Sequence, residues 1–244
     1  MQIVYEKDKS ALEEILANLT TGWILDVAAG AGGFLAWMLE AIGKVDAAIA
    51  IDNQQRALAA LEESQTDARI YPAQMDASRL AFPKGTFDCV GVSQSLHHLP
   101  EPDRTLCEMR RVLAPGGMLL VREMYADCRA EAQRTHVALH HWWAAIDTAR
   151  NISHRETYIR DDLAAIFLAM DLSGVRLFDF AEPEGDPFDR EVNTQIHEII
   201  DRYQGFADQL DGSEGFHAEG ERLRGRLERF GFQGAPQLIM LGRT

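Results

Sequence analysis

The chain has 244 residues, of which 46% are apolar and 25% charged, enough for one sizeable hydrophobic core. Its 38 acidic and 24 basic residues give a formal net charge of −14, which repels phosphate backbones and argues against nucleic-acid partners. The three cysteines form no CxxC pair, and neither a signal peptide nor an apolar run of membrane-spanning length is evident. We therefore expect a cytoplasmic protein that does not bind a membrane.

Short apolar runs alternate with helical patterns through the first half of the chain. Each apolar run suits a buried parallel strand, and such alternation implies right-handed crossovers. The expected order is helix 10–19, strand 23–28, Gly-rich turn 30–33, helix 34–42, strand 45–51, helix 53–63, strand 68–72, strand 87–93, helix 102–113, turn 115–117 and strand 118–122.

The second half is predicted to supply two strands and two helical insertions to the same domain, which spans 1–244. Residues 124–156 read as a helical lid, and Thr157 is expected to cap a helix over 157–170. Strands follow at 175–180 and 236–242, separated by a helical insertion over 182–230 with a break near 211–215. The class is thus α/β, with a doubly wound, mostly parallel, seven-stranded sheet plus helical insertions.

Small or polar residues follow the first four predicted strands. Ligands of open α/β sheets bind outside the carboxyl ends of the strands, so these residues should meet at one edge. Three of them are acids, Asp26, Asp52 and Asp76, which suits a positively charged nucleoside better than a pyrophosphate. We expect the three carboxylates to converge there.

The sequence resembles the class I S-adenosylmethionine (SAM)-dependent methyltransferases, in particular the small-molecule, type 11-like group. The family motif acid-x-Gly-x-Gly-x-Gly corresponds to Asp26-x-Ala28-x-Gly30-x-Gly32, with Ala28 in place of the first glycine. The stretches 95–99 and 111–117 also resemble the family, and the likeness covers about residues 22–124.

The resemblance implies a Rossmann-like methyltransferase fold with an antiparallel last strand, and SAM as the cofactor. It implies that Asp52 binds the ribose hydroxyls beside Asn53, that Asp76 meets the adenine amino group, and that Ser93 and Gln94 lie near the sulfonium. The implied cofactor-binding residues are Asp26, Ala28, Gly30, Gly32, Asp52, Asn53, Asp76, Ala77, Ser93 and Gln94.

The segment after the fifth predicted strand is expected to face the methyl acceptor. A general base is needed only if the acceptor atom is protonated, and four residues are candidates for that role: Glu123, Tyr125, His140 and His141. The predicted substrate-binding residues are His98, Glu123, Tyr125, His140, His141 and Trp142.

The histidines allow a second interpretation. His136 and His140 share a helical face at i and i+4, which could hold a metal completed by His154 or Glu123. An amphipathic lid helix explains the same pattern, and the adjacent His97 and His98 are common in the family as structural residues. We favour the lid and predict no metal.

Two rival functions stay open at this level. The stretch 28–33 approximates a dinucleotide fingerprint, so a nicotinamide-dependent oxidoreductase is one alternative. A non-enzymatic SAM-binding module is the other, with 190–230 as a surface for a partner or for a homodimer. The favoured interpretation is that the protein methylates a small molecule.

Overall fold

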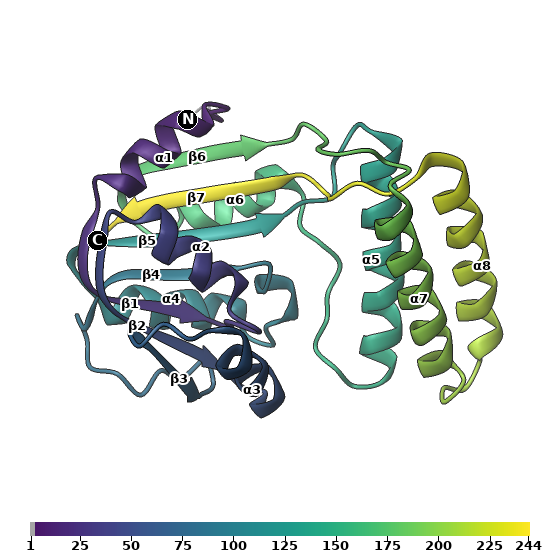
Figure 1. Cartoon of the computed structure of the whole chain (residues 1–244), viewed down its shortest axis with the longest axis horizontal. Coiled ribbons are helices and arrows are strands. Elements are labelled where there is room, and N and C mark those ends of the chain that lie inside the picture. The colour runs from purple at the N-terminus through teal and green to yellow at the C-terminus, as the bar shows by residue number, and fades with distance from the viewer. Residues whose placement is uncertain (1–2) are drawn as a thin grey trace.

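A seven-stranded sheet organises the chain in the computed structural model, which describes residues 3–244 (Figure 1). The strand order is β3-β2-β1-β4-β5-β7-β6, and β7 runs antiparallel to both of its neighbours. The strands are β1 (Thr20–Val27), β2 (Lys44–Asp52), β3 (Ile70–Gln74), β4 (Phe87–Ser93), β5 (Leu113–Met124), β6 (Ser173–Phe180) and β7 (Gln237–Arg243). The predicted sheet, including its antiparallel last strand, is confirmed.

Helices cover both faces of the sheet because successive strand residues point to opposite sides. On β1, Ile24 packs in a core with α1, α2 and α3, whereas Leu25 packs in a second core with α4 and α6. The covering helices are α1 (Lys9–Ala17), α2 (Gly33–Ala41), α3 (Gln55–Ser64), α4 (Pro102–Val112) and α6 (Arg160–Leu168). This arrangement is the predicted doubly wound fold.

The two predicted insertions pack on each other as a three-helix bundle. The bundle consists of α5 (Glu131–Ala149), α7 (Arg190–Ala207) and α8 (Ser213–Phe230). Its own core includes Leu139, Trp142, Ile200 and Leu223. In Figure 1 the bundle stands beyond the carboxyl ends of β4 and β5, where ligands of such sheets bind. No helix within residues 3–244 is long and apolar enough to cross a membrane.

Two local predictions were wrong. Residues 115–117 were expected as a turn, but they belong to an irregular start of β5, where Gly116 has φ +77° and the pairing with β4 shifts register. Thr157 does not cap a helix: α6 begins at Arg160, with Ile159 as its N-cap residue. The Thr157 hydroxyl instead pairs with His141 Nε2 at 2.9 Å, a contact from α5 that local sequence does not reveal.

Two glycine substitutions test the packing with opposite signs. A Cβ on Gly43 would lie 2.0 Å from the carbonyl oxygen of Ala17, and this backbone atom cannot easily move away. Gly43→Ala should therefore destabilise the folded protein by about 1–3 kcal/mol. Gly205 lies within α7 with open space around it, and Gly205→Ala should stabilise by roughly 0.5–1 kcal/mol. Urea unfolding monitored by circular dichroism measures both, and equal effects of the same sign would contradict the packing at Gly43.

Candidate functional site

A cavity of about 280 Å³ opens at the carboxyl ends of β1, β2, β3 and β4. Its volume is close to the lower end of small-molecule pockets. Four loops that follow strands supply most of its wall, and the loop after α5 supplies the rest. The lining residues are Ala28, Gly30, Asp52, Asn53, Gln54, Met75, Ala77, Ser95, His98, Leu99, Ile152 and Ser153.

The loop after β1 exposes its backbone to this cavity. Ala28, Gly30 and Gly32 all have positive φ, at 54°, 56° and 85°. A hydrogen bond of 2.9 Å from the Ala29 N–H to the carbonyl oxygen of Ile51 ties the loop to β2. A Cβ on Gly30 would meet nothing within 4 Å, so the backbone there lies open to a ligand. Ala28 holds a conformation that favours glycine, which makes it the strained member of the loop.

Asp52 ends β2 with its carboxylate at the cavity wall. One oxygen accepts the Gly30 N–H at 3.0 Å and the other accepts the Gln54 N–H at 2.8 Å. Each carboxylate oxygen can accept a second hydrogen bond. Two hydroxyl groups held side by side, as on a ribose, match this acceptor pair.

Asp26 lies buried next to the same loop, and neither of its carboxylate oxygens has a hydrogen-bond partner within residues 3–244. Burial raises the pKa of Asp26 to about 8, although the nearby Arg122 guanidinium opposes this shift. A buried carboxylate without a partner is costly, and a ligand that brings positive charge and N–H donors would relieve that cost. The residues present therefore fit a cationic nucleoside such as SAM.

The structure brings half of the ten predicted cofactor-binding residues to the cavity wall. Those residues are Ala28, Gly30, Asp52, Asn53 and Ala77.

Three further predicted cofactor residues point to neighbouring groups of the protein. Asp26 lies close enough to Asp52 for the Asp52 charge to raise its pKa, but Asp76 is exposed and its Oδ1 accepts the N–H of Ser78, so the expected convergence is not seen for Asp76 and only Asp52 lines the cavity. The Ser93 hydroxyl accepts from Arg122 Nε, and Gln94 Oε1 accepts the N–H of Met124.

Six lining residues were not among the predicted site residues. Ser95 and Leu99 belong to a stretch that the resemblance singled out, and Gln54 follows Asn53 directly, so their positions were within reach of sequence reasoning. Ile152 and Ser153 come from the loop after α5, which only the tertiary structure brings over the cavity.

Glu123 is not free to act as a base. Its side chain is fully buried, and its carboxylate accepts from the Leu96 N–H at 2.9 Å, from the Met124 N–H at 2.9 Å and from His97 Nδ1 at 3.0 Å. These contacts hold the 3₁₀ turn η1 (Leu96–His98) against the end of β5. Glu123 therefore positions the turn rather than reaching the acceptor.

Three other predicted acceptor-side residues lie outside the cavity wall. The Tyr125 hydroxyl donates to Asp179 at 2.6 Å, and burial raises its pKa further from neutrality. His141 pairs with Thr157, and Trp142 packs in the bundle core. The geometry does not favour these residues as substrate ligands, because their side chains are engaged elsewhere.

His98 and His140 differ in access. His98 is exposed and lines the cavity, as its predicted substrate-binding role requires. His140 is buried, and burial together with the neighbouring His97 lowers its pKa to about 2, which keeps the ring neutral. His136, the residue one turn before His140, accepts the Ala235 N–H at 2.8 Å instead of joining His140.

Comparison with known proteins identifies the segment that builds the cavity. The family model described as "Methyltransferase domain" matches residues 25–121. The ubiquinone/menaquinone biosynthesis C-methyltransferase UbiE of Teredinibacter turnerae is 34% identical over 104 residues, which are 41% of this chain and 42% of that protein. The Escherichia coli UbiE is 33% identical over 104 residues, with 41% of each chain covered. The match thus spans less than half the length of these curated relatives.

Solved structures share the fold across nearly the whole chain. The YcgJ protein of Bacillus subtilis superposes with a TM-score of 0.60 at 16% identity, covering 96% of this chain and 97% of that one. Phosphoethanolamine N-methyltransferase 2 of Haemonchus contortus, in complex with S-adenosyl-L-methionine, gives 0.56 at 16% identity, covering 96% of this chain and 51% of that one. Residues 25–121 are therefore similar to a methyltransferase domain, and nearly the whole chain shares its fold with these solved structures.

Proposed function

We propose that the chain transfers the methyl group of SAM to a small-molecule acceptor. The observation that carries this proposal is the cavity at the carboxyl ends of the parallel strands, where the Asp52 carboxylate stands beside the open backbone at Gly30. An acceptor pair for ribose hydroxyls and a backbone surface for close approach together suit a nucleoside cofactor.

The protein's part in such a reaction is mainly positional. SAM supplies an already activated methyl group, so the residues of the chain have to orient the two reactants and exclude water. Asp52 holds one end of the cofactor site through its fixed carboxylate. Ile152 and Ser153 close part of the cavity from the bundle side, and His98 is the exposed polar group on that wall.

A small molecule is the acceptor class that the surroundings favour. The loop after α5 adds Ile152 and Ser153 to the cavity wall, whereas the net charge of −14 disfavours a nucleic acid. The curated relatives named above are quinone-biosynthesis C-methyltransferases, which supports an organic acceptor of small size.

A cytoplasmic location fits the three free cysteines, since disulfides are rare in the cytoplasm. Homodimerisation stays a prediction.

Transfer of labelled methyl groups tests the proposed activity. Purified protein, methyl-labelled SAM and a small-molecule metabolite extract should yield a labelled product that mass spectrometry then identifies. SAM and its demethylated product should also raise the melting temperature, whereas NAD should not. Stabilisation by NAD alone would favour an oxidoreductase, and SAM binding without any labelled product would favour a binding module.

Replacing Asp52 by Asn should weaken SAM binding without unfolding the protein. The amide keeps the shape but loses the charge and one acceptor oxygen, and hydrogen bonds to charged groups contribute roughly 1.5–3 kcal/mol, about 10- to 150-fold in Kd. Calorimetric titration with SAM measures the change. Asp46→Asn is the matched control, because Asp46 lies exposed on the same strand. An unchanged Kd for a folded D52N protein would exclude Asp52 as a cofactor ligand.

The buried Asp26 carboxyl predicts a pH-dependent stability. Its pKa is raised from 3.8 to about 8, so the folded state holds a proton that the unfolded state releases. Its contribution to stability therefore declines as pH rises between these two values. Asp26→Asn keeps the neutral form, so the melting temperature of the ligand-free variant should exceed that of the original protein more at pH 8 than at pH 5.

The Asp46→Asn protein again serves as the control, and its melting temperature should follow the original protein at both pH values. The same Asp26→Asn change should weaken SAM binding at pH 8, where a charged carboxylate favours a cationic ligand. A melting-temperature difference that is independent of pH would contradict the assignment of a raised pKa to Asp26.

A further inference from the structure

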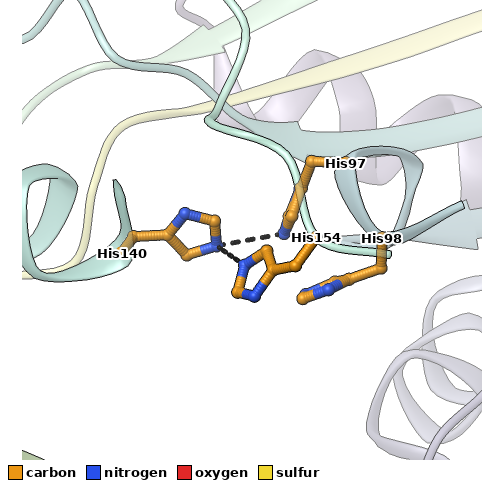
Figure 2. A group of neighbouring side chains, drawn as sticks. All are labelled: His97, His98, His140 and His154. Carbon is orange, nitrogen blue, oxygen red and sulfur yellow. Dashed lines mark hydrogen bonds between the residues drawn. The ribbon is translucent and has the colours of Figure 1, made fainter. Parts of the chain in front are cut away.

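Four histidines from three separate segments meet between the sheet and the bundle. His97 and His98 belong to the turn after β4, His140 lies on α5, and His154 lies in the loop that follows α5. One ring nitrogen from each lies within 4.8 Å of the others. Figure 2 shows the rings of His97 and His154 directed at His140, with His98 beside His154.

Three of these rings present the same nitrogen to a common point. His140 Nε2 lies 3.1 Å from His97 Nε2 and 3.2 Å from His154 Nε2 (Figure 2). All three residues are buried, with exposed fractions of 1%, 6% and 5% for His97, His140 and His154. Water therefore has little access to the nitrogens that face each other.

The opposite nitrogens of two rings are held by carboxylates. His97 Nδ1 contacts Glu123 at 3.0 Å, and His154 Nδ1 contacts Asp147 at 2.8 Å. A carboxylate accepts hydrogen bonds, so each Nδ1 carries a proton and each Nε2 of the neutral ring presents a lone pair. Within residues 3–244 no polar atom pairs with Nδ1 of His140, so nothing else fixes the direction of its lone pair.

Two lone pairs thus converge on a third imidazole nitrogen in a buried site. A proton on His140 Nε2 can form a good hydrogen bond to only one of the two neighbouring nitrogens, whereas a metal cation between the rings can bind all three nitrogens. A tetrahedral zinc ion with Zn–N bonds of about 2.0–2.1 Å holds its ligands roughly 3.3 Å apart, close to the separations found here. Histidine ligands that donate their other nitrogen to a carboxylate are the usual arrangement around zinc.

We infer that His97, His140 and His154 bind one divalent transition-metal ion of the zinc class, with the fourth coordination position facing His98. Imidazole ligands suit zinc, copper, iron and nickel, and a three-histidine set with one further position is a known catalytic zinc arrangement. Glu123 and Asp147 act as positioning residues for two of the three ligands. This site departs from the sequence-based expectation of no metal.

The fourth position borders the cofactor cavity. His98 lines that cavity, and its ring centroid lies 4.1 Å from that of His154. When an acceptor displaces His98 from this position, the ion can hold an anionic oxygen or sulfur of the acceptor near the methyl donor. That role rests on the proposed function, whereas the metal site itself does not.

Metal content tests the site independently of methyl transfer. Protein without an affinity tag, exchanged into metal-free buffer after expression, should contain about one transition-metal ion per chain by plasma mass spectrometry. After removal of the ion by a chelator, Co²⁺ should bind with 1:1 stoichiometry and give the visible absorption of a tetrahedral site. Absence of both bound metal and saturable Co²⁺ binding in folded protein overturns the site.

Variants assign the ligands. His140→Ala and His154→Ala should each reduce the bound metal at least tenfold, and Asp147→Asn should weaken Co²⁺ affinity by about 10- to 100-fold through His154. His136→Gln is the matched control: it lies one turn from His140 on α5, is engaged with Ala235, and should keep one ion per chain. Equal loss of metal from the His136 variant, or full retention in both alanine variants, contradicts the assignment.

His98→Ala tests the fourth position. The variant should keep 1:1 Co²⁺ stoichiometry because three ligands are intact, but its visible spectrum should change. An unchanged spectrum rules out His98 at the fourth position. Circular dichroism establishes that each variant is folded, so loss of metal is distinguished from unfolding. Because no assay here uses an acceptor, the metal result and the methyltransferase result can fail separately.

Discussion

The buried carboxylate of Glu123 connects the sheet to the turn after β4, and through that turn to the cavity and the histidine cluster at the carboxyl edge. Glu123 lies one residue before the end of β5 and accepts hydrogen bonds from the Leu96 N–H and from His97, and this fixes the turn after β4. That turn carries His98 to the cavity wall and directs His97 toward α5. A fully buried acid with all its contacts satisfied is stable, whereas loss of it would leave buried donors unpaired at a cost of about 1–3 kcal/mol each.

The bundle reaches the same edge by a second route. The loop after α5 runs back past the sheet, so that Ile152 and Ser153 line the cavity and His154 meets His140. Asp147 on α5 helps to hold this loop in place, because its carboxylate accepts hydrogen bonds from His154 and from the Tyr203 hydroxyl of α7. The histidine cluster thus lies where the sheet, α5 and the returning loop come together, and an ion there would join all three.

The sequence predicted the sheet well because buried parallel strands read as continuous apolar runs. It also predicted that Asp52, which ends a parallel strand, lies at this edge of the sheet, and Asp52 lines the cavity there, while its role in cofactor binding stays a prediction. Side-chain direction was harder: Asp76 follows β3 at the expected place, but its carboxylate turns to its own loop. The predicted acceptor-side role of Tyr125 is disfavoured for a related reason: the Tyr125 hydroxyl bonds to Asp179 on β6, which is 54 residues away in the chain.

The histidines illustrate the limit of local patterns most clearly. Helical spacing paired His136 with His140, yet His136 bonds to the backbone of Ala235, which precedes β7. The real neighbours of His140 are 43 and 14 residues away in the chain. Helical periodicity describes contacts along one face of one helix, whereas this cluster depends on how α5 docks against the edge of the sheet. The loop that follows α5 also brings Ile152 and Ser153 to the cavity wall, a contact that sequence alone could not resolve.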